Sequence, residues 1–340
     1  MATKPTISDV AARAGVSKGA ASFALNGKTG VSAETRDRVL RVAEELGFTP
    51  SATARALAGK RSDTLGLILA RDPGLLGSDP FFPPFIAGVE TVIAPEGRAL
   101  TLRFVEPADE AAAYTDAARA NRMDGVILAD LRVHDERPAL LAALGLPYVS
   151  LNRPEVPSIG PAVCLDDRPG IRAAAEHLIA LGHKNIAHVA GPGAYLHANN
   201  RRAEWATALL EAGLPPSQVV EADFTAKGGA TATEALLRGD PRPTAILYAN
   251  DLMAIAGIAA AQRHGLHVPD DLSVVGYDDI ELGAHLNPPL SSVGTDAYTW
   301  GRAAAQALLA LLAGGQPADS HLPAASFVAR ASTAPPRGRS

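Results

Sequence analysis

Cysteine and long hydrophobic runs are scarce in this sequence of 340 residues. The single cysteine, Cys164, excludes an internal disulfide and a cysteine-rich metal site, and its apolar neighbours predict a place in the core. The longest apolar runs, residues 65–70 and 307–313, are far shorter than the roughly 20 residues of a membrane helix. The N-terminus lacks the apolar segment of a secretory signal. We therefore expect a cytoplasmic protein with no membrane partner.

The formal net charge of −5 is divided unevenly along the chain. Residues 1–61 carry ten Lys and Arg against five Asp and Glu, a net charge of +5. The remaining residues carry 21 basic against 31 acidic side chains, a net charge of −10. A small basic segment ahead of a large acidic one predicts a polyanion partner for the first segment only. Charge alone is also compatible with chance asymmetry on solvated helix faces.

The first fifty residues predict three short helices and no strand. One helix follows Thr6, which forms with Asp9 a variant of a capping box. A second helix over residues 18–25 follows a tight glycine turn, and a third begins after Ser32. This order is typical of a helix-turn-helix. Residues 51–59 are helix-prone but shorter than the ~12 residues that persist alone, so we expect a linker that folds only when stabilised.

From residue 65 onward, short β-rich runs alternate with helical stretches. Such alternation predicts parallel sheets covered by helices, and the length of this region suits two sheets better than one. The predicted strands are residues 65–69, 100–105, 125–128, 148–151, 186–189, 245–248 and 273–277.

Polar side chains follow several of these strands, where ligands of open parallel sheets bind. Their amide, carboxylate and guanidinium groups could converge on one ligand, although each alone could equally be a helix cap or a surface charge. They are Asn152 and Arg153, Asn250 and Asp251, Asp278 and Asp279, and, beyond the glycine-rich turn at 191–193, Arg201 and Arg202.

Aromatic residues make up only 5% of the chain, yet three of them cluster. Phe81, Phe82 and Phe85 follow an Asp-Pro pair, and Phe224 has polar neighbours. Flat rings beside amides and carboxylates suit the apolar face of a sugar ring. The alternative is that these phenylalanines belong to the core, most of all Phe85.

Motifs of catalysis and metal binding are lacking. The nine histidines show no HExxH spacing, and there is neither a GxSxG elbow nor a phosphate-binding GxxxxGK[ST] loop. Asp278, Asp279 and Glu281 could contribute to a metal site, but no histidine lies at a recognisable spacing from them. We expect no catalytic residue, no metal and no cofactor.

Motifs along nearly the whole chain resemble those of the LacI/GalR family of transcription regulators. In the N-terminal part they are Thr6-Ile7-Ser8-Asp9-Val10-Ala11, Ala14-Gly15-Val16-Ser17, Ser22, Leu25-Asn26, Val31-Ser32, Thr35-Arg36, Leu46-Gly47-Phe48 and Pro50. Beyond it they are Leu57-Ala58-Gly59, Glu176-His177-Leu178, Leu181-Gly182-His183, Ala190-Gly191-Pro192, Asn250-Asp251, Val274-Val275-Gly276-Tyr277-Asp278-Asp279 and Arg330-Ala331-Ser332.

The resemblance implies a small all-α helix-turn-helix headpiece followed by an α/β effector domain like a periplasmic binding protein. The headpiece would cover residues 1–50, a hinge helix and linker 51–61, and the effector-binding and dimerisation domain 62–340. The latter would have two Rossmann-like lobes. Residues from about 62–164 and 293–326 would form the first lobe, and residues from about 165–292 and 327–340 the second.

The resemblance also implies two sets of site residues. Effector-binding positions carry over onto Phe81, Phe82, Phe85, Asn152, Arg201, Phe224, Asn250, Asp278 and Thr295. DNA-binding positions carry over onto Thr6, Ser17, Lys18, Gly19, Ala20, Ser22, Phe23, Asn26, Thr35, Ala54, Leu57 and Lys60.

Two departures from the family pattern stand out. Glu204 replaces the glycine of the usual RxxG[FW] motif that begins at Arg201. In the predicted recognition helix, Ala20-Ala21-Ser22-Phe23 stands where the family often has Thr-Val-Ser-Arg. Phe23 cannot make the bidentate guanine contact of an arginine, so it packs either on a thymine methyl group or on the protein itself.

We therefore expect a homodimeric bacterial repressor, nucleoid-associated when bound to a pseudo-palindromic operator in double-stranded DNA. Leu57 would enter the minor groove, and a small effector would control operator affinity, most simply a neutral sugar or oligosaccharide. A transport-type sugar-binding protein with the same two lobes is the first alternative, which the basic headpiece disfavours. A cytoplasmic α/β enzyme is the second.

Overall fold

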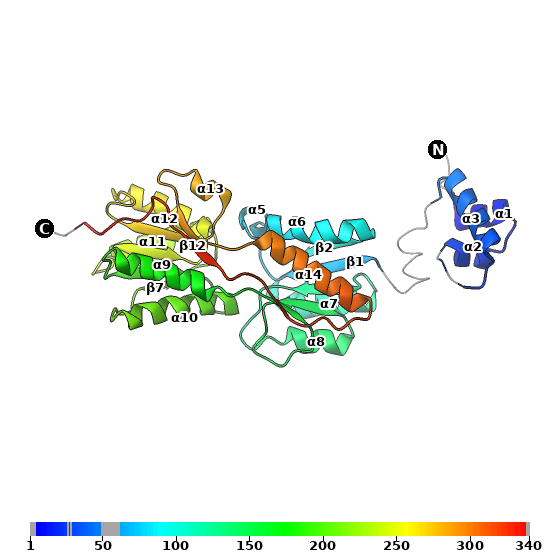
Figure 1. Cartoon of the computed structure of the whole chain (residues 1–340), viewed down its shortest axis with the longest axis horizontal. Coiled ribbons are helices and arrows are strands. Elements are labelled where there is room, and N and C mark those ends of the chain that lie inside the picture. The colour runs from blue at the N-terminus through cyan, green and yellow to red at the C-terminus, as the bar shows by residue number, and fades with distance from the viewer. Residues whose placement is uncertain (1–4, 26, 28, 49–61, 338–340) are drawn as a thin grey trace.

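The computed structural model describes residues 5–25, 27, 29–48 and 62–337 (Figure 1). Four of the expected DNA-binding residues, Asn26, Ala54, Leu57 and Lys60, lie outside these ranges, as does the whole of the expected hinge, residues 51–61. Among the described residues, no helix has the length and apolar character needed to span a bilayer.

The headpiece consists of helices α1 (Ile7–Ala14), α2 (Lys18–Leu25) and α3 (Ala33–Glu45). The capping box is present, because the backbone N–H of Thr6 donates to Asp9 over 2.7 Å. Gly15 ends α1 at a φ of 65°, a left-handed conformation that glycine adopts without strain. Apolar residues such as Val10 and Val39 form a small core between the three helices. The helix-turn-helix predicted from the sequence is therefore correct.

The first sheet contains six parallel strands in the order β11-β5-β4-β3-β1-β2. These strands are β1 (Thr64–Leu69), β2 (Ala99–Phe104), β3 (Gly125–Leu128), β4 (Tyr148–Leu151), β5 (Ala162–Cys164) and β11 (Ser320–His321). Consecutive residues of β1 belong to different hydrophobic clusters. Leu67 packs with α6 (Phe82–Ile93) and α14 (Ala297–Leu312), whereas Ile68 packs with α7 (Glu110–Arg119) and α8 (Arg137–Leu144). Both faces of the sheet are therefore covered.

The second sheet also has six strands, in the order β12-β10-β9-β8-β6-β7, and only β12 runs antiparallel to its neighbour. They are β6 (Ile186–Ala190), β7 (Val219–Glu221), β8 (Ala245–Tyr248), β9 (Ser273–Asp278), β10 (Ser291–Gly294) and β12 (Ser326–Val328). Its helices are α9 (Arg168–Ala180), α10 (Leu196–Glu211), α11 (Ala226–Arg238) and α12 (Asp251–Arg263). The short helices α5 (Leu75–Ser78) and α13 (Glu281–Ala284) and the 3-10 turns Ala94–Glu96 and Pro107–Asp109 lie between longer elements.

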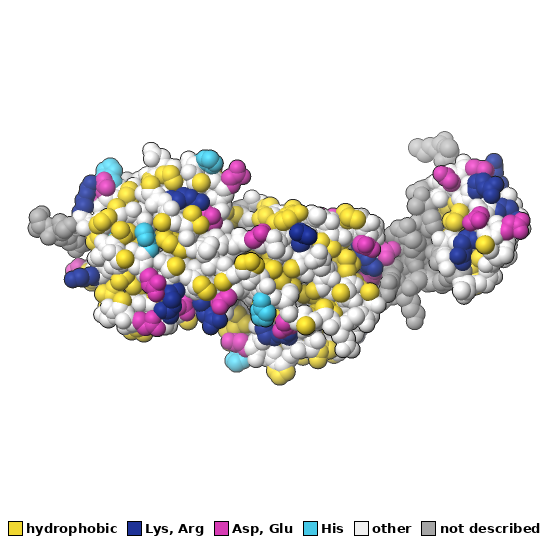
Figure 2. All heavy atoms as spheres, viewed as in Figure 1, with side chains coloured by type: hydrophobic (Ala, Val, Ile, Leu, Met, Phe, Trp, Pro, Cys, Tyr) yellow, Lys and Arg dark blue, Asp and Glu magenta, His cyan; other side chains and the backbone are white. Residues whose placement is uncertain are grey.

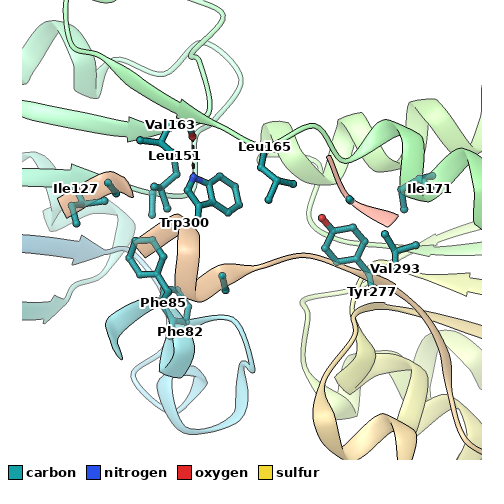
Figure 3. Packing of buried hydrophobic residues seen from close by; sticks show 14 of the residues in the cluster. Phe82, Phe85, Ile127, Leu151, Val163, Leu165, Ile171, Tyr277, Val293 and Trp300 are labelled. Carbon is teal, nitrogen blue, oxygen red and sulfur yellow. Dashed lines mark hydrogen bonds between the residues drawn. The ribbon is translucent and has the colours of Figure 1, made fainter. Parts of the chain in front are cut away.

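The chain crosses between the two sheets three times: after β5, between β10 and α14, and between β11 and β12. Buried apolar residues run continuously from one sheet to the other beside these crossings (Figure 3). Trp300 of α14 lies on the side of the first sheet and Tyr277 of β9 on the side of the second, with Leu165 between them. The Trp300 indole donates a hydrogen bond to the carbonyl of Val163 over 2.9 Å, which fixes α14 against β5.

Two glycines allow α6 and α14 to approach each other closely. A Cβ added at Gly301 would meet the carbonyl oxygen of Phe85 at 2.1 Å, and one added at Gly88 would meet that of Tyr298 at 2.1 Å. The backbones of the two helices are therefore in direct contact at this crossing.

Gly301→Ala should consequently lower the free energy of unfolding by about 1–3 kcal/mol, the usual cost of overpacking. Helix propensity alone would give the opposite sign, because alanine is about 1 kcal/mol better than glycine inside a helix. Urea unfolding of the variant measures the sign directly. Ala310→Gly, at an exposed position of the same helix, is the control for propensity. A stabilised Gly301→Ala protein would contradict the close approach.

Candidate effector site

A cavity of about 230 Å³ lies between the two sheets, beyond the carboxyl ends of their strands. Four of the lining residues, Asp130, Asn152, Phe224 and Asp278, have positive φ angles. For an aromatic residue such as Phe224, at 65°, this conformation is strained, and such strain concentrates at functional sites. The full lining is Arg71, Asp79, Phe81, Phe82, Ala129, Asp130, Leu131, Leu151, Asn152, Arg153, Glu155, Asp167, Leu196, His197, Asn200, Arg201, Phe224, Asn250, Tyr277, Asp278, Thr295 and Trp300.

The structure brings eight of the nine expected effector residues to this cavity: Phe81, Phe82, Asn152, Arg201, Phe224, Asn250, Asp278 and Thr295. The ninth, Phe85, lies elsewhere. Its side chain is 0% exposed inside the first core, and its ring stacks under that of Phe81 with centroids 5.2 Å apart. Phe85 therefore holds Phe81 in place and does not reach the cavity.

Arg201 is held in place by a carboxylate, a backbone carbonyl and an aromatic ring. Its Nε donates to Asp167 over 3.0 Å, and its Nη1 donates to the carbonyl of Ala249 over 2.9 Å. The guanidinium carbon also lies 3.4 Å from the centre of the Tyr277 ring, and the Tyr277 hydroxyl donates to Asp167. Burial opposes the charge, but Tyr277 and Asp167 outweigh it and raise the pKa of Arg201. Arg201 thus presents a fixed positive charge at the cavity wall.

Asp278 ends β9 at a φ of 116°, which turns its carboxyl group into the cavity wall. Burial raises the pKa of Asp278 well above its usual range, and the carboxylates of Asp251 and Asp79 add to this effect. A ligand that donates hydrogen bonds would favour its charged form.

Asn152 and Asn250, the two expected asparagines, differ in which of their polar atoms the protein already binds. The Asn250 side chain accepts from the N–H of Met253 and donates to the carbonyl of Phe224, both over 2.9 Å, and the residue is only 4% exposed. It caps α12 and fixes the strained Phe224 loop. Asn152 accepts through Oδ1 from the N–H of Leu165 over 2.7 Å, which orients its amide nitrogen as a donor for a ligand.

A charged cluster around Arg71 was missed by the sequence analysis. Arg71 makes two 2.6 Å hydrogen bonds to Asp130 and one of 3.1 Å to Asp79. Its guanidinium carbon lies 5.1 Å from the ring centre of Tyr195 and 5.5 Å from that of Phe224, both from the second lobe. The strand-end rule could have found Arg71 and Asp130, because they stand two residues beyond β1 and β3. Asp167, His197, Tyr277 and Trp300 follow no such rule.

The charges around the cavity favour a neutral or cationic occupant. Three arginines line it (Arg71, Arg153 and Arg201), against five acidic residues (Asp79, Asp130, Glu155, Asp167 and Asp278). Each arginine is paired with a carboxylate: Arg71 with Asp130, Arg201 with Asp167, and Arg153 with Asp319 outside the lining. Burial lowers the pKa of His197 to about 4, so this ring is neutral at pH 7.

The aromatic ring best placed to contact a ligand is not that of Phe224, which the sequence had suggested. Phe224 is only 5% exposed, and its ring stacks with that of His197 at 5.5 Å and lies beside Arg71. Phe81 is less buried and meets Trp300 edge to face at 5.9 Å. Phe81 and Trp300 therefore offer the better apolar wall, and Phe224 supports Arg71 and His197.

In the headpiece, six of the described DNA-binding candidates lie on α2 or directly before it, whereas Thr6 caps α1 and Thr35 lies in α3. Lys18, Gly19 and Phe23 are exposed, whereas the Ser17 hydroxyl accepts from the N–H of Ala20 over 3.1 Å and caps the helix. Ala20, Ser22 and Thr35 are partly exposed, and Thr6 is exposed beside its capping partner. Basic and acidic side chains are interspersed on the face of the headpiece that Figure 2 shows.

Comparison with known proteins matches both parts of the chain. The family described as periplasmic binding protein-like domain covers residues 175–333, and that of bacterial regulatory proteins, lacI family, covers residues 6–51. The HTH-type transcriptional regulator CelR of Thermobifida fusca is 34% identical over 315 residues, 92% of this chain and 93% of that protein. Catabolite control protein A of Priestia megaterium is 34% identical over 308 residues, 89% of this chain and 91% of that protein.

Two solved structures are similar over nearly the whole chain. A complex of the regulator CelR with cellobiose has a TM-score of 0.74 at 32% identity and covers 96% of this chain and 99% of its own. A lac repressor dimer bound to operator and the anti-inducer ONPF has a TM-score of 0.81 at 32% identity. The match covers 98% of this chain and 100% of the lac repressor chain. The resemblance seen in the sequence is confirmed, and this chain belongs to the lacI family of bacterial regulatory proteins.

Proposed function

We propose that this protein is a transcriptional repressor whose affinity for its operator is controlled by a neutral sugar or oligosaccharide in the interlobe cavity. It acts in the bacterial cytoplasm as a homodimer on a pseudo-palindromic site, and it is a binding protein, not an enzyme. One observation carries the choice of effector: a cavity with an excess of carboxylates over arginines lies beside the apolar rings of Phe81 and Trp300.

Charge and shape both support a neutral sugar. The arginines are already paired, so an anionic ligand would find no free cationic partner among them, and its charge would further oppose the ionisation of Asp278 in a partly dry site. Sugar hydroxyls can donate to a carboxylate and accept from an amide, while a sugar ring can lie on an aromatic wall. Two related structures hold sugar-type ligands, cellobiose with CelR and ONPG with the lac repressor.

Within the site we assign roles to the lining residues. Asp278 accepts from effector hydroxyls, Asn152 and Arg201 donate, and Phe81 and Trp300 form the apolar wall, with the more deeply buried Phe82 behind it. Thr295 faces the effector at the crossover between β10 and α14. Asn250 and Phe224 shape the site from behind, as Phe85 does for Phe81.

Control of DNA binding follows from the position of the cavity between the lobes. An effector that touches both lobes changes the balance between open and closed arrangements only by its difference in affinity for them. We divide the chain for this purpose as headpiece 1–50, hinge 51–61 and effector domain 62–340. The described candidates for DNA contact are Thr6, Ser17, Lys18, Gly19, Ala20, Ser22, Phe23 and Thr35.

The test has two arms, both on the full chain. Calorimetric titration with neutral mono- and disaccharides, phosphorylated sugars and purines should give binding for at least one neutral sugar and none for the anionic sugars. An operator selected from random duplex DNA should then change its affinity when that sugar is added. Binding of a phosphorylated sugar or a purine alone would overturn the effector assignment. Failure to enrich any DNA sequence would overturn the repressor assignment.

A further inference from the structure

The exposed side of α2 carries few groups that can hydrogen-bond to bases. The helix sequence is Lys18-Gly19-Ala20-Ala21-Ser22-Phe23-Ala24-Leu25, and Lys18 is its one charged residue. Ala21 and Ala24 are buried against the other headpiece helices. Hydrogen bonds to base edges can therefore come from Lys18 and Ser22 alone among its side chains.

Phe23 is the largest side chain on this helix, and the headpiece fold does not use its ring as core. It is 44% exposed, and the apolar core of the headpiece is formed by other residues, including Val10 and Val39. Leaving an aromatic ring half in water forgoes part of the hydrophobic free energy of its burial. A large part of the Phe23 side chain is therefore left for contact with a partner.

The ring of Phe23 has a defined neighbour at its edge. A Cβ added at Gly30 would meet the Cδ2 and Cε2 atoms of Phe23 at 3.2 and 3.4 Å. Gly30 also has a φ of 116°, a conformation that side chains rarely adopt, so this position stays free of a side chain that would displace the ring. One edge of the ring thus lies close to the backbone of Gly30, and 44% of the residue remains exposed.

We propose that Phe23 reads the C5 methyl group of a thymine in the major groove. The inference rests on the proposed function, because it takes α2 as the helix that enters the groove. Thymine is the one standard base that presents an apolar group there, and aromatic side chains contact it. The small residues Gly19 and Ala20 on the same exposed side allow the helix backbone to come close to the bases.

The consequence is a rule of specificity for this operator. At the position that Phe23 faces, a thymine is preferred and a guanine gives no bidentate partner. A cytosine carries no methyl group, but a 5-methylcytosine carries one at the equivalent place. The protein should therefore distinguish pyrimidines by their C5 substituent at this position.

The experiment changes only the methyl group. An operator is first selected from random duplex DNA with wild-type protein, and selection with Phe23→Arg identifies the position whose preference changes. Replacing thymine by uracil there should weaken wild-type binding about fourfold per half-site, the value for loss of one buried methyl group. Replacing cytosine by 5-methylcytosine at the same position should strengthen binding by the same factor.

Phe23→Ala provides the matched control in the protein. It should bind the thymine and uracil operators equally, while its thermal unfolding stays close to that of wild type. Equal wild-type affinity for thymine and uracil operators would overturn the proposal, and that measurement needs no variant. A Phe23→Ala protein that still distinguishes the two operators would also overturn it. If the wild-type protein enriches no operator, the proposed function itself fails. That result comes from the selection step and is distinct from the comparison of thymine with uracil.

Discussion

Asp278→Ala should weaken binding of the sugar effector by 2–5 kcal/mol, a factor of about 30 to 5000. The loss is large because effector hydroxyls would remain in the cavity without their acceptor, beside an arginine that Asp167 already occupies. Calorimetric titration of the effector into wild type and variant gives the two dissociation constants. Operator affinity without effector should stay at the wild-type value, since Asp278 lies at the end of β9 in the second sheet.

Glu281→Ala is the matched control for Asp278. This carboxylate stands three residues further along the chain, is exposed, and does not line the cavity. Its removal changes the charge of the protein equally and should leave effector affinity within a factor of two or so. If both variants bind the effector like wild type, the carboxylate of Asp278 takes no part in recognition, and the role given to it here is wrong.

Arg137→Met should lower the free energy of unfolding by about 3–5 kcal/mol, the usual cost of breaking a buried ion pair. Arg137 lies at the start of α8 and donates to Asp135, to Glu110 over 3.0 Å and to the carbonyl of Asp130 over 2.7 Å. Glu110 and Asp135 are also buried, so removal of the guanidinium leaves two carboxylates in a poorly solvated place with less compensation. Urea unfolding followed by circular dichroism measures the loss.

Arg238→Met tests whether burial is the reason for that effect. Arg238 pairs with Glu234 one turn away on α11, and its side chain is largely exposed. Exposed pairs of this kind contribute at most about 1 kcal/mol, so this variant should be close to wild type. Similar losses of unfolding free energy for both variants would mean that burial does not strengthen the ion pairs of Arg137.

The ion pairs of Arg137 also matter for the cavity. Arg137 donates to the backbone carbonyl of Asp130, and the side chain of Asp130 is the partner of Arg71.

Six of the seven predicted strands lie inside their sheets, where strands buried on both faces read as short apolar runs, and the seventh, β2, lies at a sheet edge. All seven predicted runs are strands in the structure, with ends within one residue of the prediction. Five others, β5, β7, β10, β11 and β12, were not foreseen. They are two to four residues long, and β11, Ser320–His321, and β10, which begins Ser291-Ser292, have polar sequences. Their pairing depends on neighbours that only the assembled sheet provides.

The residues of the site also fall into a predictable group and an unpredictable one. Residues at strand ends or directly after them, such as Asp278 and Asn152, could be named from the sequence because the topology of parallel sheets fixes where the strands end. Trp300 and Tyr277 sit within regular elements and reach the cavity only because the chain crosses between the sheets beside them. Phe85 shows the limit of a motif: it lies in α6 four residues after Phe81, the cap of that helix, and packing alone decides that one ring is covered by the other.

The three crossings between the sheets constrain the order in which the protein can fold during synthesis. The first sheet is begun by residues 64–69, but α14 and β11, which complete it, are residues 297–312 and 320–321. Until the ribosome has made this last part, α6 lacks its partner helix, and apolar residues around Phe82 and Phe85 lack the cover of Trp300 and Leu308. The second sheet waits in turn for β12 at residues 326–328. Neither lobe is therefore complete until the C-terminal part of the chain has been made, and we expect the nascent chain to expose apolar surface until then.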